Sequence, residues 1–221
     1  MAIARKKFQT PAPTDVQRVL HTLSSAYGSA KTELAYENPF QLLVAVILSA
    51  QCTDVRVNRT TPALFARYPT AERLAAADPK DVEKLIHSCG FFRQKTKSII
   101  SVARDLLEKF DGKVPNTLDE LTTLRGVGRK TASVVLNQAF DLPAIAVDTH
   151  VMRVSQRLGW THNKTPEKIE FDLRDLVPMP QWALINGLLV LHGRRTCQAR
   201  KPNCPNCGVR EVCVYFKSTK A

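Results

Sequence analysis

The chain has 221 residues, 44% of them hydrophobic, which suffices for one large domain or two small domains with their own cores. Its 32 Lys and Arg exceed its 20 Asp and Glu, so the net charge of +12 favours a nucleic-acid partner over a membrane surface or a merely soluble basic protein. The sequence contains no run of 18 apolar residues, so no transmembrane helix is predicted. The N-terminal stretch MAIARKKFQT lacks the apolar core of a secretory signal. A short organellar transit peptide is the alternative for that stretch.

Helical patterns follow one another through the first half of the chain. Thr14 is the predicted cap of a first helix, whose apolar residues recur at helical spacing: Val16, Val19, Leu20 and Leu23. Asn38-Pro39 supplies a cap and a first-turn proline for FQLLVAVILSA, which is apolar on all sides and therefore predicts a buried helix. Further helices are predicted to begin near Thr53, Thr70 and Asp78-Pro79, and Gly90 is the predicted end of the last one.

The second half continues in the same way. Residues 93–110 place one apolar stripe opposite Lys and Arg, and Thr117 is the predicted cap of a short helix. Four more helices are expected, at residues 128–140, 149–159, 166–177 and 181–193. No segment alternates as a strand would, so we predict an all-α protein.

Four of the six cysteines lie within CQARKPNCPNCGVREVC and have the spacing C-x6-C-x2-C-x5-C: Cys197, Cys204, Cys207 and Cys213. Four thiolates this close can surround one soft metal centre. Structural zinc is one interpretation, although zinc sites more often contain two C-x2-C pairs. The uneven single loop favours the four separate corners of an iron–sulfur cubane.

The loop between the first two of these cysteines carries two basic residues, Arg200 and Lys201. A loop fixed by a metal centre can hold such side chains against phosphates; otherwise they form a solvated basic loop. Cys52 and Cys89 lie far from this cluster and are expected to be small buried apolar residues.

A Gly-Val-Gly turn lies between two predicted helices, within LRGVGRKTA at residues 124–132. Gly126 and Gly128 permit a tight turn around Val127, and the helix that follows presents unpaired backbone N–H groups to an anion. This pattern is a helix-hairpin-helix signature, expected at about residues 118–140, which grips a DNA phosphate without reading bases.

Lys130 follows this turn directly, beside Arg129. It is either another phosphate contact or a nucleophile, which requires the neutral amine; a helix start and a neighbouring cation both favour that form. Asp148 follows an apolar run and precedes a helix, so it is an N-cap, and it could also be catalytic. Only a short segment containing Pro143 separates the helices of Lys130 and Asp148, which would allow the two side chains to meet.

Three stretches in order, LRGVGRKTASVVLNQAF, AVDTHVMRV and CQARKPNCPNC closing at Cys213, resemble the endonuclease III family of DNA glycosylase/AP lyases. LSAQCTDVRVN at residues 48–58 is similar to the same family, and the resemblance spans roughly residues 30–213. It implies two helical domains flanking a DNA-binding cleft. Residues 32–142 would form a six-helix barrel with the helix-hairpin-helix, and residues 1–31 with 143–221 would form the cluster domain, holding a 4Fe-4S cluster.

The resemblance also implies roles for single residues. Lys130 matches the Schiff-base lysine and Asp148 the catalytic aspartate of the family. Gln51 matches a residue that fills the gap left by an extruded nucleotide. The alternative is that Gln51 is simply a polar residue at the end of a helix. Phe91 falls where the family places an apolar wedge in the opposite DNA strand. The alternative is that Phe91 packs in the core. One departure is Arg125, where the family commonly has proline.

The resemblance implies base excision repair: removal of oxidised pyrimidines from duplex DNA and β-elimination at the abasic site through a lysine Schiff base. The expected partner is double-stranded DNA that contains damaged bases or abasic sites. The protein is expected to be a monomer that does not bind a membrane. In a bacterium we expect it in the cytoplasm, at the nucleoid.

Three alternatives remain. An adenine mismatch glycosylase usually lacks this lysine and has an acid in the helix matching residues 40–50, whereas FQLLVAVILSA has none. The others are a non-enzymatic helix-hairpin-helix DNA-binding protein with structural zinc, and a redox sensor that uses the cluster as its switch.

Overall fold

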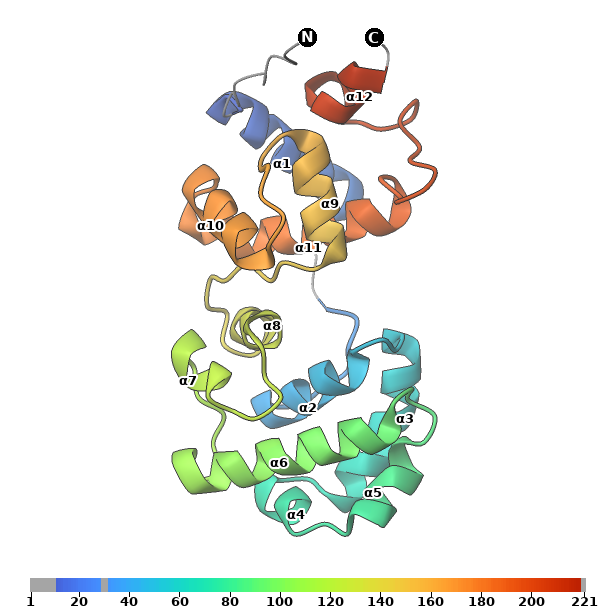
Figure 1. Ribbon diagram of the computed structural model, residues 1–221, viewed down its shortest axis with the longest axis vertical. Coiled ribbons are helices and arrows are strands. Elements are labelled where there is room, and N and C mark those ends of the chain that lie inside the picture. Colours follow the sequence, from blue (N-terminus) through green and yellow to red (C-terminus); the bar gives the residue numbers. More distant parts are fainter. Residues whose placement is uncertain (1–10, 29–31, 220–221) are drawn as a thin grey trace, which may run out of the picture. The chain divides into compact units, whose positions relative to one another are not determined.

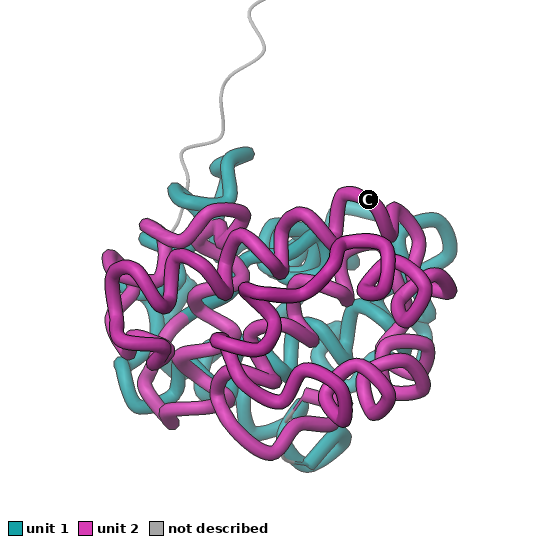
Figure 2. Tube along the Cα trace, turned by 90° about the horizontal axis from the view of Figure 1, so that it is seen from below, with its two compact units in different colours: residues 1–31, 145–221 teal, residues 32–144 magenta. Residues whose placement is uncertain are grey.

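The computed structural model describes residues 11–28 and 32–219. Every regular element within these ranges is a helix, which confirms the all-α prediction. The expectations for the MAIARKKFQT stretch lie outside the described residues. The chain divides into two compact units, coloured separately in Figure 2: residues 32–144, and residues 1–31 with 145–221. None of the described helices has the length and apolar composition that crossing a membrane requires.

The unit of residues 32–144 contains seven described helices: α2 (Pro39–Ser49), α3 (Asp54–Arg67), α4 (Ala71–Ala75), α5 (Pro79–Ile86), α6 (Phe92–Phe110), α7 (Leu118–Thr122) and α8 (Arg129–Ala139). The long helix α6 packs against α2, α4 and α5, and α2 also packs against α3 and α8 (Figure 1). Residues 40–48 of α2 are all buried, as its all-round apolar sequence predicts. The core of this unit therefore forms around α2 and α6.

Local capping explains where several of these helices begin. The side chain of Asn38 accepts a hydrogen bond from the Gln41 N–H, with Pro39 in the first turn. Thr117 and Glu120 form a reciprocal pair at the start of α7, with the Thr117 hydroxyl donating to the Glu120 carboxylate at 2.6 Å. The prediction for Gly90 was wrong, because α5 ends at Ile86, four residues earlier.

The other unit contains five described α-helices and two 3-10 turns: α1 (Pro13–Tyr27), α9 (Thr149–Leu158), α10 (Pro166–Leu176), η1 (Met179–Gln181), α11 (Trp182–Arg195), η2 (Arg210–Val212) and α12 (Val214–Thr219). Helix α11 packs against α1 and α9, and α12 returns onto α9. The four predicted apolar residues of α1 are all buried. Its N-cap is Ala12, so the prediction of Thr14 as cap was wrong; Thr14 is already inside the helix, where Pro13 supplies the first turn.

Candidate DNA-repair site

The Gly-Val-Gly turn joins α7 to α8 as the sequence predicts. Gly126 has a φ of +84°, a conformation that side chains rarely adopt, and Val127 is buried beneath the turn. Gly128 is the N-cap of α8, and no side chain caps the helix there. The first N–H groups of α8 consequently lack an intrahelical partner, which makes this helix start able to bind an anion.

Lys130 is the second residue of α8, two positions after the N-cap, and its side chain is exposed. Arg129 precedes it and is half-buried. Among the described residues, no salt bridge involves the Lys130 amine. The amine can therefore reach an incoming molecule at the same helix start whose unpaired N–H groups are able to bind an anion.

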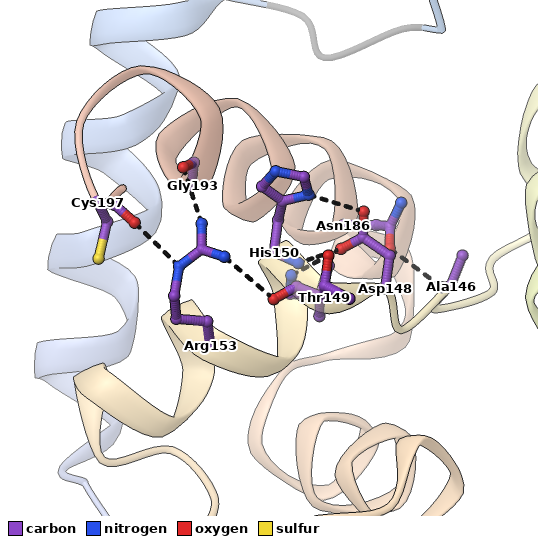
Figure 3. Close-up of polar contacts among 9 residues, drawn as sticks. Ala146, Asp148, Thr149, His150, Arg153, Asn186, Gly193 and Cys197 are labelled. Carbon is purple, nitrogen blue, oxygen red and sulfur yellow. Dashed lines mark hydrogen bonds and ion pairs between the residues drawn. The ribbon is translucent and has the colours of Figure 1, made fainter. Parts of the chain in front are cut away.

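Asp148 is the N-cap of α9, so its predicted capping role is confirmed. Its Oδ1 accepts hydrogen bonds from the N–H groups of His150 and Val151, both at 2.8 Å, and its Oδ2 lies 3.1 Å from Nδ1 of His150 (Figure 3). The side chain is 16% exposed, so the carboxylate is held by its own helix and still reaches the surface. Lys130 belongs to the unit of residues 32–144 and Asp148 to the other unit.

Arg153 fastens the helix of Asp148 to the cysteine segment. Its guanidinium donates to the carbonyl oxygens of Gly193 at 2.8 Å, Cys197 at 3.1 Å and Thr149 at 3.4 Å (Figure 3). These three acceptors lie at the last turns of α11, at the first cysteine and at the start of α9. One side chain thus ties together three segments, so a displacement of the cysteine segment would be felt at the start of α9.

The four clustered cysteines, Cys197, Cys204, Cys207 and Cys213, line one pocket. Burial raises the pKa of the Cys207 and Cys213 thiols, so the thiolate form needs a compensating positive group. Arg157 places a positive charge beside a different cysteine of the group, with Nη1 3.3 Å from the Cys197 sulfur. The four cysteines thus line one pocket, although Cys197 and Cys213 are 16 positions apart in sequence. Within residues 11–28 and 32–219, no group of three or more His, Cys, Asp or Glu side chains is arranged to hold a metal ion.

His192 lies against the same pocket and is buried. Its Nδ1 is 3.0 Å from the Tyr27 hydroxyl, and its Nε2 is 3.7 Å from the Cys207 sulfur. Burial lowers the pKa of His192 to about 4, so the ring is neutral at neutral pH. Arg200 and Lys201 are exposed on the loop between Cys197 and Cys204, as the sequence suggested.

Gln51 and Phe91 share an unusual backbone conformation. Both have positive φ values, +52° and +57°, and both are exposed, Phe91 to 67%. A Cβ built on Gly90 would lie 3.9 Å from the Gln51 carbonyl oxygen, so the two loops adjoin. The core-packing interpretation of Phe91 was wrong, whereas Gln51 does lie at a helix end, two residues after Ser49.

Cys89 is buried, as expected, and Cys52 is half-buried. Sequence reasoning missed His150, Arg153 and Arg157, since none belongs to a recognisable cluster in sequence. It also missed α12, whose six residues are too few to show a period. For Arg153 and Arg157 a signal was present: two arginines four positions apart on the helix that Asp148 caps share one face.

Comparison with known proteins agrees with this geometry. Residues 44–179 match the family described as HhH-GPD superfamily base excision DNA repair protein. Endonuclease III of Synechocystis sp. is 52% identical over 196 residues, covering 88% of this chain and 90% of the relative. Endonuclease III of Escherichia coli is 44% identical over 184 residues, covering 83% and 87%.

Among solved structures, a trapped endonuclease III–DNA covalent intermediate superimposes with a TM-score of 0.89 at 39% identity, covering 95% of this chain and 99% of that one. A non-covalent endonuclease III–DNA complex gives 0.88 at the same identity, covering 95% and 98%. The chain therefore belongs to the endonuclease III family of base excision repair DNA glycosylase/lyases.

Proposed function

We propose that this chain removes oxidised pyrimidines from duplex DNA and then cleaves the abasic site, with Lys130 as the nucleophile. The observation that carries the proposal is an exposed lysine in the first turn of α8, directly after an uncapped glycine turn. That turn can bind a DNA phosphate, which would bring the sugar to the amine. Its relative in the solved structure was trapped as a covalent intermediate with DNA.

The proposed reaction proceeds by substitution and elimination. The neutral amine of Lys130 attacks C1′ of the damaged nucleotide, the bond from C1′ to the base breaks, and the base leaves with the electron pair and takes up a proton. The sugar ring opens to an imine. Loss of a proton from C2′ then expels the 3′ phosphate, which cuts the strand.

Asp148 is assigned to the same reaction. Its carboxylate would stabilise the positive charge that develops on the sugar as the base departs, and it would accept or return protons. The hydrogen bonds from His150 and Val151 support this assignment, because they hold one oxygen in a fixed position.

Four other features are assigned to DNA binding. The turn of Gly126, Val127 and Gly128 would present backbone N–H groups at the start of α8, and together with Arg129 these would hold one phosphate. Arg200 and Lys201 would hold other phosphates. Phe91 and Gln51 would enter the stack where the damaged nucleotide is extruded, which costs less for a base that pairs poorly. Their exposure and their strained backbone on adjoining loops support this role.

The four cysteines are assigned to a 4Fe-4S cluster. They line one pocket, and burial disfavours the thiolate form of two of them, which a bound cationic centre would offset. The single C-x2-C pair within an uneven loop supports the four separate corners of a cubane over zinc. When bound, the cluster would supply structural cross-linking of the cysteine loop that carries Arg200 and Lys201.

The two units would correspond to a barrel domain, residues 32–142, and a cluster domain, residues 1–31 and 143–221; the observed division falls at 144/145. The protein would act as a monomer, in the cytoplasm of a bacterial cell.

Borohydride trapping tests the proposal. The protein is incubated with a duplex that contains one thymine glycol, with borohydride to reduce the imine to a stable protein–DNA adduct. The wild type should give the adduct, and Lys130→Ala should give none. Lys80→Ala is the matched control, because Lys80 is also the exposed second residue of a helix, α5.

An adduct that persists in Lys130→Ala would remove Lys130 from the nucleophile role. A second duplex, with adenine opposite 8-oxoguanine, tests the alternative that the chain is an adenine mismatch glycosylase. Release of that adenine, without action on thymine glycol, would assign the chain to mismatch repair.

A further inference from the structure

We infer that Asp105 of α6 is a positioning residue for the DNA-binding hairpin, because it grips Arg125 and so fixes the turn that presents the N–H groups of α8. The inference rests on the proposed role of this turn in phosphate binding. It concerns Asp105, Arg125, the turn and α8, which all belong to the unit of residues 32–144.

Asp105 is an acid where an apolar residue would be expected. It lies on the buried face of α6 between Val102 and Leu106, and its side chain is 2% exposed. A buried carboxylate without partners would cost several kcal/mol, so its hydrogen bonds determine whether it can be retained. Its carboxylate accepts two hydrogen bonds from one residue, Arg125, 20 positions later.

Arg125 binds this carboxylate through both its backbone and its side chain. The backbone N–H donates to Oδ2 at 2.7 Å, Nε donates to Oδ1 at 2.8 Å, and Nη2 lies 2.6 Å from Oδ1. The two guanidinium contacts hold the carboxylate in the position that the backbone bond requires. The backbone bond fixes the turn itself, directly before Gly126.

The residues around Arg125 complete the attachment. Leu124 and Val127, on either side of the turn, are buried, and the Val127 N–H donates to the Leu124 carbonyl oxygen at 3.0 Å. Lys109, one turn further along α6, donates to the carbonyl oxygen of Thr123 at 3.1 Å. The hairpin is thus tied to α6 by the Arg125–Asp105 ion pair and the Lys109–Thr123 hydrogen bond, while Leu124 and Val127 belong to the core of the unit.

This arrangement predicts a change in DNA affinity opposite to the change that net charge alone predicts. The Arg125 side chain is 60% exposed, and its Nε and Nη2 both contact Asp105. Replacing Asp105 by asparagine removes a negative charge and frees the guanidinium, so charge alone would tighten DNA binding. If Asp105 instead sets the turn, the same replacement must weaken it.

The experiment measures the dissociation constant for a duplex that carries a reduced abasic-site analogue, and for the same duplex without it. Asp105→Asn should weaken binding to both by about fivefold or more, the order expected for loss of one well-placed phosphate contact. The single-turnover rate of cleavage at saturating DNA should stay within about twofold, since the Lys130 chemistry is retained once DNA has bound.

Asp81→Asn is the matched control, because it raises the net charge equally and breaks the exposed Arg67–Asp81 pair of the same unit. Its affinity should equal or slightly exceed that of the wild type. Arg125→Lys is the second variant: it keeps the charge and the backbone N–H but loses the planar fork. It should weaken binding less than Asp105→Asn does.

If Asp105→Asn fails to fold, Arg125→Lys decides the matter, since wild-type affinity in that folded variant overturns the inference. Tighter binding by folded Asp105→Asn overturns it as well. These outcomes are distinct from failure of the proposed function, which would appear as a wild type that binds DNA normally but gives no borohydride adduct.

Discussion

Asp148 caps α9 through the N–H groups of His150 and Val151, and its second oxygen lies 3.1 Å from Nδ1 of His150. Three contacts therefore orient one carboxylate within three residues of its own backbone. This geometry makes it possible to separate the capping role of Asp148 from its proposed chemical role.

Asp148→Asn should keep the fold and lose the reaction. Asparagine is as good an N-cap as aspartate, so the free energy of unfolding should change by less than about 1 kcal/mol. Base release should slow by roughly 100-fold or more, because the amide cannot carry the charge or move protons. Denaturant unfolding and single-turnover glycosylase assays measure the two effects, and a near-normal rate of base release would contradict the assignment.

Arg153→Met should destabilise the unit of α9 and α11. The substitution removes three hydrogen bonds, to the carbonyl oxygens of Thr149, Gly193 and Cys197, of which the last keeps a donor from Arg157 at 3.4 Å. We expect a loss of about 2–3 kcal/mol in the free energy of unfolding and faster loss of iron on heating. Arg18→Met, at an exposed position on α1 in the same unit, should change neither quantity.

Cys204→Ser should abolish the proposed cluster. The protein should lose its absorbance near 400 nm and its iron and sulfide, and it should bind duplex DNA more weakly because the Arg200 and Lys201 loop is no longer fixed. Cys52→Ser is the control, since Cys52 lies outside the pocket. Equal iron content in the two variants would remove Cys204 from the ligand set.

Gln51→Gly should raise stability while lowering activity. Glycine adopts the φ of +52° without strain, so the free energy of unfolding should rise by about 1 kcal/mol. Affinity for a lesion duplex should nevertheless fall, because the side chain that we propose enters the stack is gone. Asp111→Gly is a matched control with a φ of +50° at the end of α6; it should gain similar stability at unchanged affinity.

The stability of the protein at acid pH should depend on Asp105. Burial raises the pKa of its carboxyl, but the hydrogen bonds and charge of Arg125 outweigh this, and the pKa lies below its ordinary value. The unfolded chain then binds the proton first as the pH falls below about 4, so stability contributed by this pair is lost from there downward. The difference in unfolding free energy between wild type and Asp105→Asn should be constant at neutral pH and shrink at acid pH; a pH-independent difference would contradict this.

Several features could be predicted because they depend on neighbours in sequence. Asn38 and Pro39 start α2, and Thr117 starts α7, through bonds that span three residues. The glycine turn and the cysteine spacing are likewise local, so the proposed nucleophile and ligands follow from short motifs. Local signals also misled: Thr14 is a good cap by type, but Pro13 had already begun the helix.

The sequence by itself determined the helical class, the family and the candidate chemical groups, since these follow from periodicity and short motifs. Only the tertiary structure decided that Phe91 is exposed, that Arg153 joins α9 to the cysteine segment, and that Asp105 holds Arg125. Each of these depends on which distant segment packs against the residue. The free energy cost of burying a charge depends on the partner that this segment supplies. Composition and spacing do not contain this information, because a buried carboxylate and an exposed one are written with the same letter.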